Sequence, residues 1–144
     1  MRVRRAPTST LAGGFYTTTH SEHAENWSRR KALRSGGVPT VDVNEFDDTM
    51  PLNVKSFPEN DESWVEFVCA CHRGSDVYRH YDLIVGGVAD DKVFRAVDMY
   101  ARGTWDLQTT LAALVFFERT DQCCFVSQKA IDATLAFAES YEVQ

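Results

Sequence analysis

The sequence predicts a single domain of the α+β class. Its 144 residues are enough for one hydrophobic core and too few for two independent ones. Hydrophobic residues make up 44% and aromatic residues 12%, so most of the chain can fold around a compact core. Short strand patterns are mixed with helical patterns in irregular order. A doubly wound parallel sheet would need strict alternation of strand and helix, so the irregular order favours α+β.

The first part of the chain is expected to hold an arm, a strand and a helix. Residues 1–12 carry a proline and a Ser/Thr cluster, which is typical of an extended or loose basic arm, and residues 13–144 then form the domain. Gly13–Thr18 is rich in aromatic and β-branched residues, which predicts a strand. A Thr-x-x-Glu capping box predicts that a helix begins at Thr19 and runs to Arg34, where two glycines stop it.

The spacing of hydrophobic residues predicts which face of this helix is buried, and it also predicts the elements in the middle of the chain. Ala24 and Trp27 are expected on the buried face of the helix, and residues 29–31 on its exposed face. Val41 and Val43 share one face of an alternating, half-buried strand pattern. The expected elements are a strand over 38–46, a turn over 47–51, an extended piece over 52–57, a buried helix over 61–72 and a strand over 81–85 that ends at Gly86-Gly87.

Acidic and hydroxyl side chains that precede periodic apolar segments predict the helices of the last third. The expected elements are a helix from Asp90 to Ala101, a helix from Asp106 to Glu118, a strand over Gln122–Val126 and a terminal helix capped by Ser127. The terminal helix would bury Ile131, Leu135 and Ala138 on its inner face.

Charge is distributed unevenly along the chain, although the net charge is only −6. Residues 1–40 hold seven Lys/Arg against two Glu, a net charge of +5, whereas the remainder holds 8 basic against 19 acidic residues, a net charge of −11. A basic segment on an acidic body suits an anionic ligand, but a solvated helix gives the same pattern. If the segment serves a ligand, at least one of Arg4, Arg5, Arg29 and Arg30 should face the site and pair with phosphate oxygens.

Several kinds of site and compartment are not expected. No run approaches ~20 apolar residues, as a membrane-spanning helix requires, and no apolar segment resembles a secretory signal. The cysteines at 69, 71, 123 and 124 lack zinc-binding spacing and are expected as reduced core residues of a cytoplasmic protein. Phosphate-loop and zinc-protease motifs are absent, and no histidine pair has helical i, i+4 spacing, so no metal is expected. A nucleophilic pair of Cys71 or Cys123 with His80 stays open.

Three segments carry a more specific pattern. They are Gly14-Phe15-Tyr16-Thr17-Thr18-Thr19 with Ala24 and Trp27 after it, the run YDLIVGGVADD from Tyr81, and the run DQCCFVS from Asp121 with Ala130 after it. In this order and spacing they resemble the domain-of-unknown-function family numbered 3990. That family is assigned to the ADP-ribosyltransferase superfamily, and some of its members sit in toxin–antitoxin pairs.

The resemblance implies an ADP-ribosyltransferase-like domain in which two small sheets with flanking helices form a cleft for NAD. Tyr16 would stack on the nicotinamide ring, and Gln122 would take the catalytic position where many relatives carry a glutamate. The implied cofactor-binding residues are Arg5, Gly14, Phe15, Tyr16, Thr17 and Thr18. Relatives also have a first strand with a Tyr-His-Gly-like segment, which residues 1–12 do not match. Three interpretations stay open: a chain truncated so that it lacks that strand, a start at a late methionine, or a degenerate first strand.

The activity implied by the resemblance is transfer of ADP-ribose from NAD to an unknown acceptor, by an intracellular bacterial toxin. Breaking the nicotinamide–ribose bond develops oxocarbenium character, which favours an aromatic floor and a polar group on the ribose hydroxyls. Gln122 can orient a ribose through hydrogen bonds, but an amide cannot act as a general base. Two alternatives stay open: a catalytically silent module that binds a protein partner such as an antitoxin, and a nucleotide-binding module without transfer activity.

Overall fold

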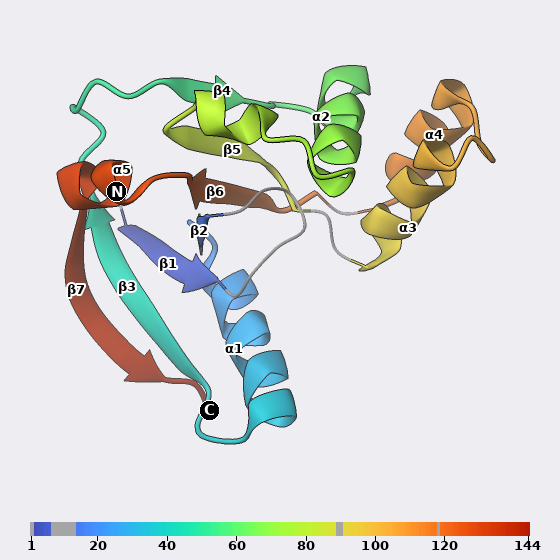
Figure 1. Ribbon diagram of the computed structural model, residues 1–144. Coiled ribbons are helices and arrows are strands. Elements are labelled where there is room, and N and C mark those ends of the chain that lie inside the picture. Colours follow the sequence, from blue (N-terminus) through green and yellow to red (C-terminus); the bar gives the residue numbers. More distant parts are fainter. Residues whose placement is uncertain (1, 7–13, 89–90, 118) are drawn as a thin grey trace.

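A computed structural model describes residues 2–6, 14–88, 91–117 and 119–144 of the chain. These residues form seven strands and five α-helices, which confirms the α+β class (Figure 1). The elements are β1 (Arg2–Ala6), β2 (Phe15–Thr18), α1 (Ser21–Ser35), β3 (Thr40–Phe46), β4 (Val54–Ser56), α2 (Glu62–His72), a 3₁₀ turn η1 (Val77–His80), β5 (Leu83–Gly87), α3 (Asp91–Ala101), α4 (Leu107–Leu114), β6 (Asp121–Phe125), α5 (Gln128–Thr134) and β7 (Leu135–Glu142).

The seven described strands belong to one sheet, in the order β4-β5-β6-β2-β1-β3-β7. All neighbouring strands are antiparallel except β4 and β5, which are parallel. This arrangement differs from the two small sheets that the family resemblance implies. The described sheet is continuous because β1 pairs with β2 along one edge and with β3 along the other.

The sequence predicts a loose arm for residues 2–6, but they form β1 in the middle of the sheet. Because three of its residues are arginines, the sequence of this segment does not reveal a strand. Its backbone is nevertheless paired on both sides, and Val3 is fully buried. The exposed charge of Arg2 is balanced across the sheet by Glu45 at 2.8 Å and Glu139 at 3.3 Å. The rest of the expected arm lies outside the described residues.

Helix α1 begins without the capping box that the sequence predicts. Its N-cap is His20, whose side chain makes no capping hydrogen bond, and the helix starts at Ser21. The hydroxyl of Thr18, at the end of β2, accepts the hydrogen bond from the His20 N–H instead. The other features of the helix are confirmed: Ala24 and Trp27 are buried, and the helix ends at a glycine with positive φ, Gly36.

The C-terminal segment, which the sequence predicts as one helix, forms a short helix followed by a strand. Ser127 caps α5 as predicted, accepting a hydrogen bond from the N–H of Ala130 at 3.1 Å. The helix ends at Thr134, and residues 135–142 extend along β3 as β7. The predicted inner face is wrong in that Ala138 is exposed on this strand. Pairing with a strand about ninety residues earlier decides the outcome, which local periodicity cannot reveal.

The other predicted elements are present with shifted boundaries. Asp106 caps α4, as predicted, by accepting a hydrogen bond from the N–H of Thr109 at 2.7 Å, but that helix ends four residues earlier than expected, at Leu114. The predicted cap Asp90 and the predicted helix end Glu118 lie outside the described residues. Strand β5 runs through its glycines instead of ending before them. A Cβ on Gly87 would lie 2.4 Å from Asn60 Oδ1, so the glycine allows the loop before α2 to lie against the strand.

The helices cover the two halves of the sheet differently (Figure 1). The main core joins side chains of β2, β5 and β6 to those of α2, α3 and α4. On the opposite face of β5 and β6, a second cluster includes Ala130 and Ile131 of α5. A third and smaller cluster joins Ala24 of α1 to Val41 and Val43 of β3. One half of the sheet is therefore covered on both faces.

Candidate active site

Tyr16 and Gln122 lie on the same face of two adjacent strands. Tyr16 of β2 is paired directly with Cys124 of β6, and side chains of paired residues project to the same side. Gln122 is two residues from Cys124 along β6, so it shares that face as well. On the next strand Gln122 is paired with Gly86, which has no side chain to compete for the space beside it.

Arg4 of β1 lies on this face too. It is paired with Thr18, two residues after Tyr16, so a row of residues crosses the sheet from Arg4 through Thr18 toward Gln122. One terminal nitrogen of Arg4 donates to the carbonyl of Thr19 at 3.5 Å. Its Nε is buried and has no hydrogen-bond partner among the described residues. Arg4 is thus an arginine of the basic segment that shares the sheet face of Tyr16 and Gln122.

The other arginines considered from the sequence lie elsewhere or are described only in part. Arg29 donates hydrogen bonds to Asn26 on its own helix and to the C-terminal carbonyl of Gln144 at 3.0 Å. Arg30 is exposed on α1. Arg5 is paired through its backbone with Thr17, and its side chain lies outside the described part of the chain.

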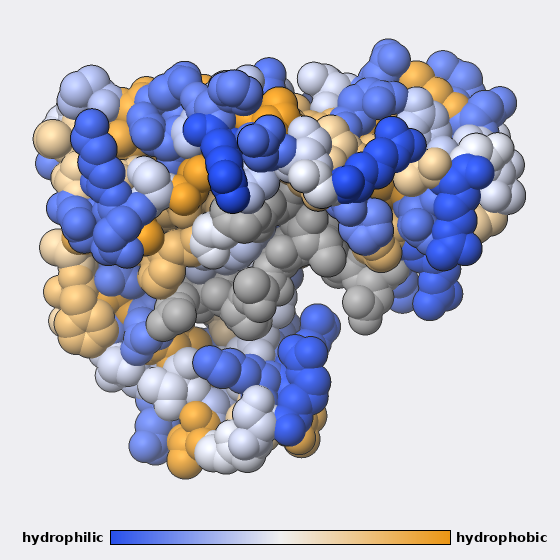
Figure 2. Space-filling view, viewed as in Figure 1, coloured by the Kyte–Doolittle hydropathy of each residue, from blue (hydrophilic) through white to orange (hydrophobic). Residues whose placement is uncertain are grey.

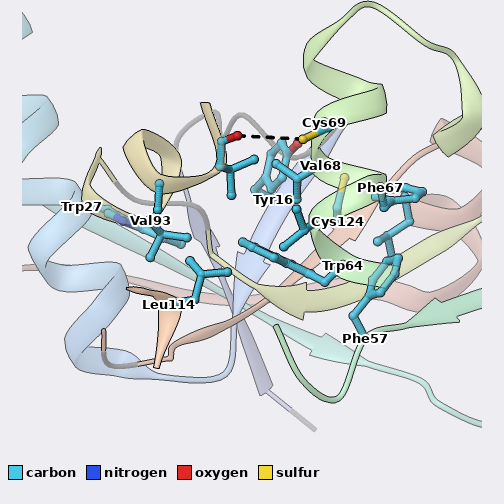
Figure 3. Close-up of a cluster of buried hydrophobic side chains, with 14 residues drawn as sticks. Tyr16, Trp27, Phe57, Trp64, Phe67, Val68, Cys69, Val93, Leu114 and Cys124 are labelled. Atoms are coloured by element: carbon cyan, nitrogen blue, oxygen red, sulfur yellow. Dashed lines mark hydrogen bonds between the residues drawn. The ribbon is translucent and has the colours of Figure 1, made fainter. Parts of the chain in front are cut away.

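Both predicted catalytic side chains are covered. The exposed fraction is 1% for Tyr16 and 0% for Gln122. The ring of Tyr16 lies among the core side chains contributed by α2, including Val68 and Cys69, as Figure 3 shows. In this conformation neither side chain is accessible to a ligand.

The residues around Tyr16 hold β2 against β6. The Thr17 hydroxyl donates to the carbonyl of Cys123 at 3.2 Å, and the Thr18 hydroxyl donates to the carbonyl of Asp121 at 3.1 Å. Gly14 approaches β6 so closely that a Cβ there would lie 2.6 Å from the carbonyl oxygen of Phe125. These contacts give the glycine and both threonines structural roles.

Phe15 lies on the opposite face of the sheet from Tyr16. It packs with the cluster beneath α5, which contains Phe125 and Ala130. Of the implied cofactor-binding residues, the structure therefore brings Tyr16 and Thr18 together with Gln122 and separates Phe15 from them.

The cysteines are protonated thiols at neutral pH. Burial raises the pKa of Cys123 and of Cys124 to about 11, and a hydrogen bond from Tyr16 lowers the Cys124 pKa only in part. Burial raises the pKa of Cys71 to about 11 as well. Because the thiolate is the reactive form, these values argue against the nucleophilic Cys–His pair.

A hollow of about 330 Å³ lies near the end of the strands that carry Gln122 and Gly86. Its polar lining includes Asn60, which packs on Gly87, and Arg119, which forms a 2.9 Å salt bridge with Asp121. Neither residue stands out in the sequence. The Gly86-Gly87 pair was the available signal, since glycine in a strand often marks a place where another segment approaches closely.

A comparison with known protein families shows to which family the chain belongs. Residues 5–137 match the family described as "Protein of unknown function (DUF3990)". The chain belongs to this family. No curated protein and no solved structure matches the chain. The DUF3990 match spans β2, β5 and β6, the strands whose sequences carry the three predicted motifs.

Two further observations bear on the kind of site. Among the described residues of this DUF3990 chain, no group of three His, Cys, Asp or Glu side chains is arranged to hold a metal ion. None of the described helices has the length and apolar character needed to cross a membrane.

Proposed function

We propose that this DUF3990 protein is an ADP-ribosyltransferase that uses NAD as its substrate and acts in the bacterial cytoplasm as a toxin. The observation that carries the proposal is the common face of Tyr16 and Gln122 on adjacent strands, with Arg4 beside them. It is supported by the three sequence segments that resemble the family, two of which supply these residues. The acceptor of the ADP-ribose is not specified by these features.

Arg4, Gln122 and Tyr16, which share this face of the sheet, differ in how well they suit contacts with NAD. The buried Nε of Arg4 lacks a partner among the described residues, and a guanidinium suits a phosphate oxygen. The amide of Gln122 suits a ribose hydroxyl, because it can both donate and accept hydrogen bonds. The ring of Tyr16 is packed into the core, so stacking on nicotinamide requires a conformation in which this ring is uncovered.

The amide of Gln122 sets the character of the proposed reaction. It can hold the ribose while positive charge develops, but it cannot take a proton from water or from an acceptor. The catalytic contribution of Gln122 is therefore positional and electrostatic. A transferase with this residue relies on its acceptor for nucleophilicity and hydrolyses NAD slowly in the acceptor's absence.

The test compares the buried Gln122 of β6 with the exposed Gln128 of α5. Gln122→Met keeps the side-chain volume and removes the amide, so nicotinamide release should fall by about 10²-fold, as when one transition-state donor is lost. NAD affinity should change less. Gln128→Met, on the exposed surface of α5, should leave the rate unchanged. The assay measures nicotinamide release by the purified chain with bacterial lysate as the source of acceptor. Equal rates for Gln122→Met and the parent protein would remove Gln122 from catalysis.

The burial of Tyr16 and Gln122 favours a second candidate function, a catalytically silent module that binds a protein partner such as an antitoxin. Calorimetric titration with NAD separates the candidates. A folded chain that shows no binding at about 1 mM NAD, the upper end of ordinary substrate KM values, supports the silent module. Binding without nicotinamide release supports a nucleotide-binding module instead.

A further inference from the structure

The hollow beside Arg119 has two walls of different chemistry. One wall is the segment before α2, where Glu59, Asn60 and Asp61 follow one another. The other wall is apolar and comes from α4 and the residues after it; it consists of Leu111, Leu114, Val115 and Phe117. The volume of about 330 Å³ is at the small end of the range for ligand pockets, which suits one long side chain better than a whole cofactor.

The charged groups of this hollow leave an excess of negative charge. Arg119 is the basic residue of its lining, and its guanidinium is already held by the carboxylate of Asp121 and the carbonyl of Phe57. Among the residues that the structure describes, no salt bridge engages Glu59 or Asp61. Asp61 accepts the capping hydrogen bond from Trp64, which uses only part of its acceptor capacity.

The apolar wall continues onto the surface. Val115 and Phe116 follow α4 directly, and their exposed fractions are 82% and 87%. Two adjacent apolar side chains exposed to this extent, beside a hollow with an apolar wall, are typical of a contact surface for another protein.

We propose that this hollow is a docking site for a basic side chain of a partner protein, on a segment that also carries an apolar residue. The aliphatic stem of an arginine or lysine packs along Leu111 and Leu114, and its charged head meets the carboxylates of Glu59 and Asp61. Arginine suits the site better than lysine, because a planar guanidinium can pair with two carboxylate oxygens at once. The apolar neighbour of that residue rests on Val115 and Phe116. This proposal does not depend on binding of NAD.

The first experiment tests the charged head. The probe is N-acetyl-arginine amide, and the control probe is the citrulline analogue, which has the same shape and no charge. Titration of the isotope-labelled chain, followed by backbone amide NMR shifts, should show saturable changes at residues 59–61 and 111–117 with the arginine probe. Citrulline should bind at least about threefold more weakly, as expected for a partly exposed ion pair. Equal affinity for both probes, or shifts that map elsewhere, would overturn the proposal.

Variants at the acidic wall provide the matched comparison. Glu59→Gln and Asp61→Asn should each weaken arginine binding by about threefold to tenfold, and asparagine can still cap α2. Glu62→Gln is the control, because Glu62 is exposed, adjacent in sequence and absent from the lining. Higher ionic strength should weaken binding to the parent chain and leave the variants less affected. An affinity that neither variant changes would also reject the proposal.

The second experiment tests the protein partner against a free small cation. The probe is a short acetylated peptide with leucine next to arginine, and it should bind more tightly than N-acetyl-arginine amide. Phe116→Ser should remove that gain and leave binding of N-acetyl-arginine amide unchanged, because Phe116 lies outside the lining. A peptide that binds no better than the amino-acid amide would show a site for a small cation and would contradict docking of a protein segment.

Discussion

The half of the sheet that contains β5, β6 and β2 differs from the half that contains β3 and β7 in how many faces are covered. The first half has helices on both faces, and every residue of β6 after Asp121 is buried. In the second half only two residues of β3 are buried, and six of the eight residues of β7 are exposed. Hydrophobic residues reach the surface along β7, at the left edge of Figure 2. Candidate site residues on a doubly covered strand are therefore also core residues, so their mutation affects stability as well as function.

The half of the sheet that contains β5, β6 and β2 is called the covered half. The largest expected effect is loss of stability when the aromatic ring of Tyr16 in this half is removed. Tyr16→Ala deletes a ring that is 1% exposed, and such truncations cost about 3–5 kcal/mol of unfolding free energy. Phe137→Ala in β7, where the side chain is 67% exposed, should change it by less than about 0.5 kcal/mol. Urea unfolding of both variants measures the difference. Similar losses at the two positions would break the contrast between the two halves.

A smaller effect is expected from the thiols of the covered half. The pKa of Cys123 and of Cys124 rises from 9.0 to about 11 because folding removes them from water. The neutral thiol is thus favoured in the folded state. This contribution to stability is complete below about pH 9 and is lost as the pH rises toward about 11. Unfolding free energy should therefore decline over this range, and a double Cys→Ala variant should show a shallower decline. Equal slopes for the two proteins would show that the thiols do not govern it.

The smallest effect is expected from the ion pairs of the open half, the part of the sheet that contains β1, β3 and β7. Arg2 contacts Glu45 and Glu139, but the three side chains are about half exposed. Pairs of this kind contribute about 0–1 kcal/mol, so Arg2→Gln should lower the unfolding free energy only slightly. The loss should shrink further in high salt. A loss comparable to that of Tyr16→Ala would mean that the open half is not the weaker part of the structure.

The same contrast explains what the sequence could predict. The strand β2, Phe15–Thr18, follows from local residue types, and the shared face of Tyr16 and Gln122 is implied by the resemblance to the family. The burial of these two side chains depends on how α2, α3 and α4 pack over the sheet, which no local pattern contains. The predicted cap at Thr19 is wrong. The run of three threonines offers several hydroxyls, and the one that accepts a hydrogen bond from the His20 N–H belongs to Thr18, at the end of β2.

The errors in the open half have a different cause. Residues 135–138, Leu-Ala-Phe-Ala, are compatible with a helix or a strand, and only the partner strand β3 selects the strand. Residues 2–6 carry three arginines, a composition typical of a surface arm, and become a strand because β2 and β3 each present an edge to them. In both places long-range pairing overrides local propensity.

The position of β1 makes the number of sheets depend on very few contacts. Among the described residues, three pairs join β1 to β2: Arg4 with Thr18, Arg5 with Thr17, and Ala6 with Tyr16. Without them the described sheet would separate into β4-β5-β6-β2 and β1-β3-β7, each with a new unpaired edge. Along the chain β1 precedes both of its partners, so both of its edges can be paired only after β3 has been synthesised, and β7 follows later still to cover the outer edge of β3. A strand made before both of its partners is thus the joint on which assembly of the two halves depends.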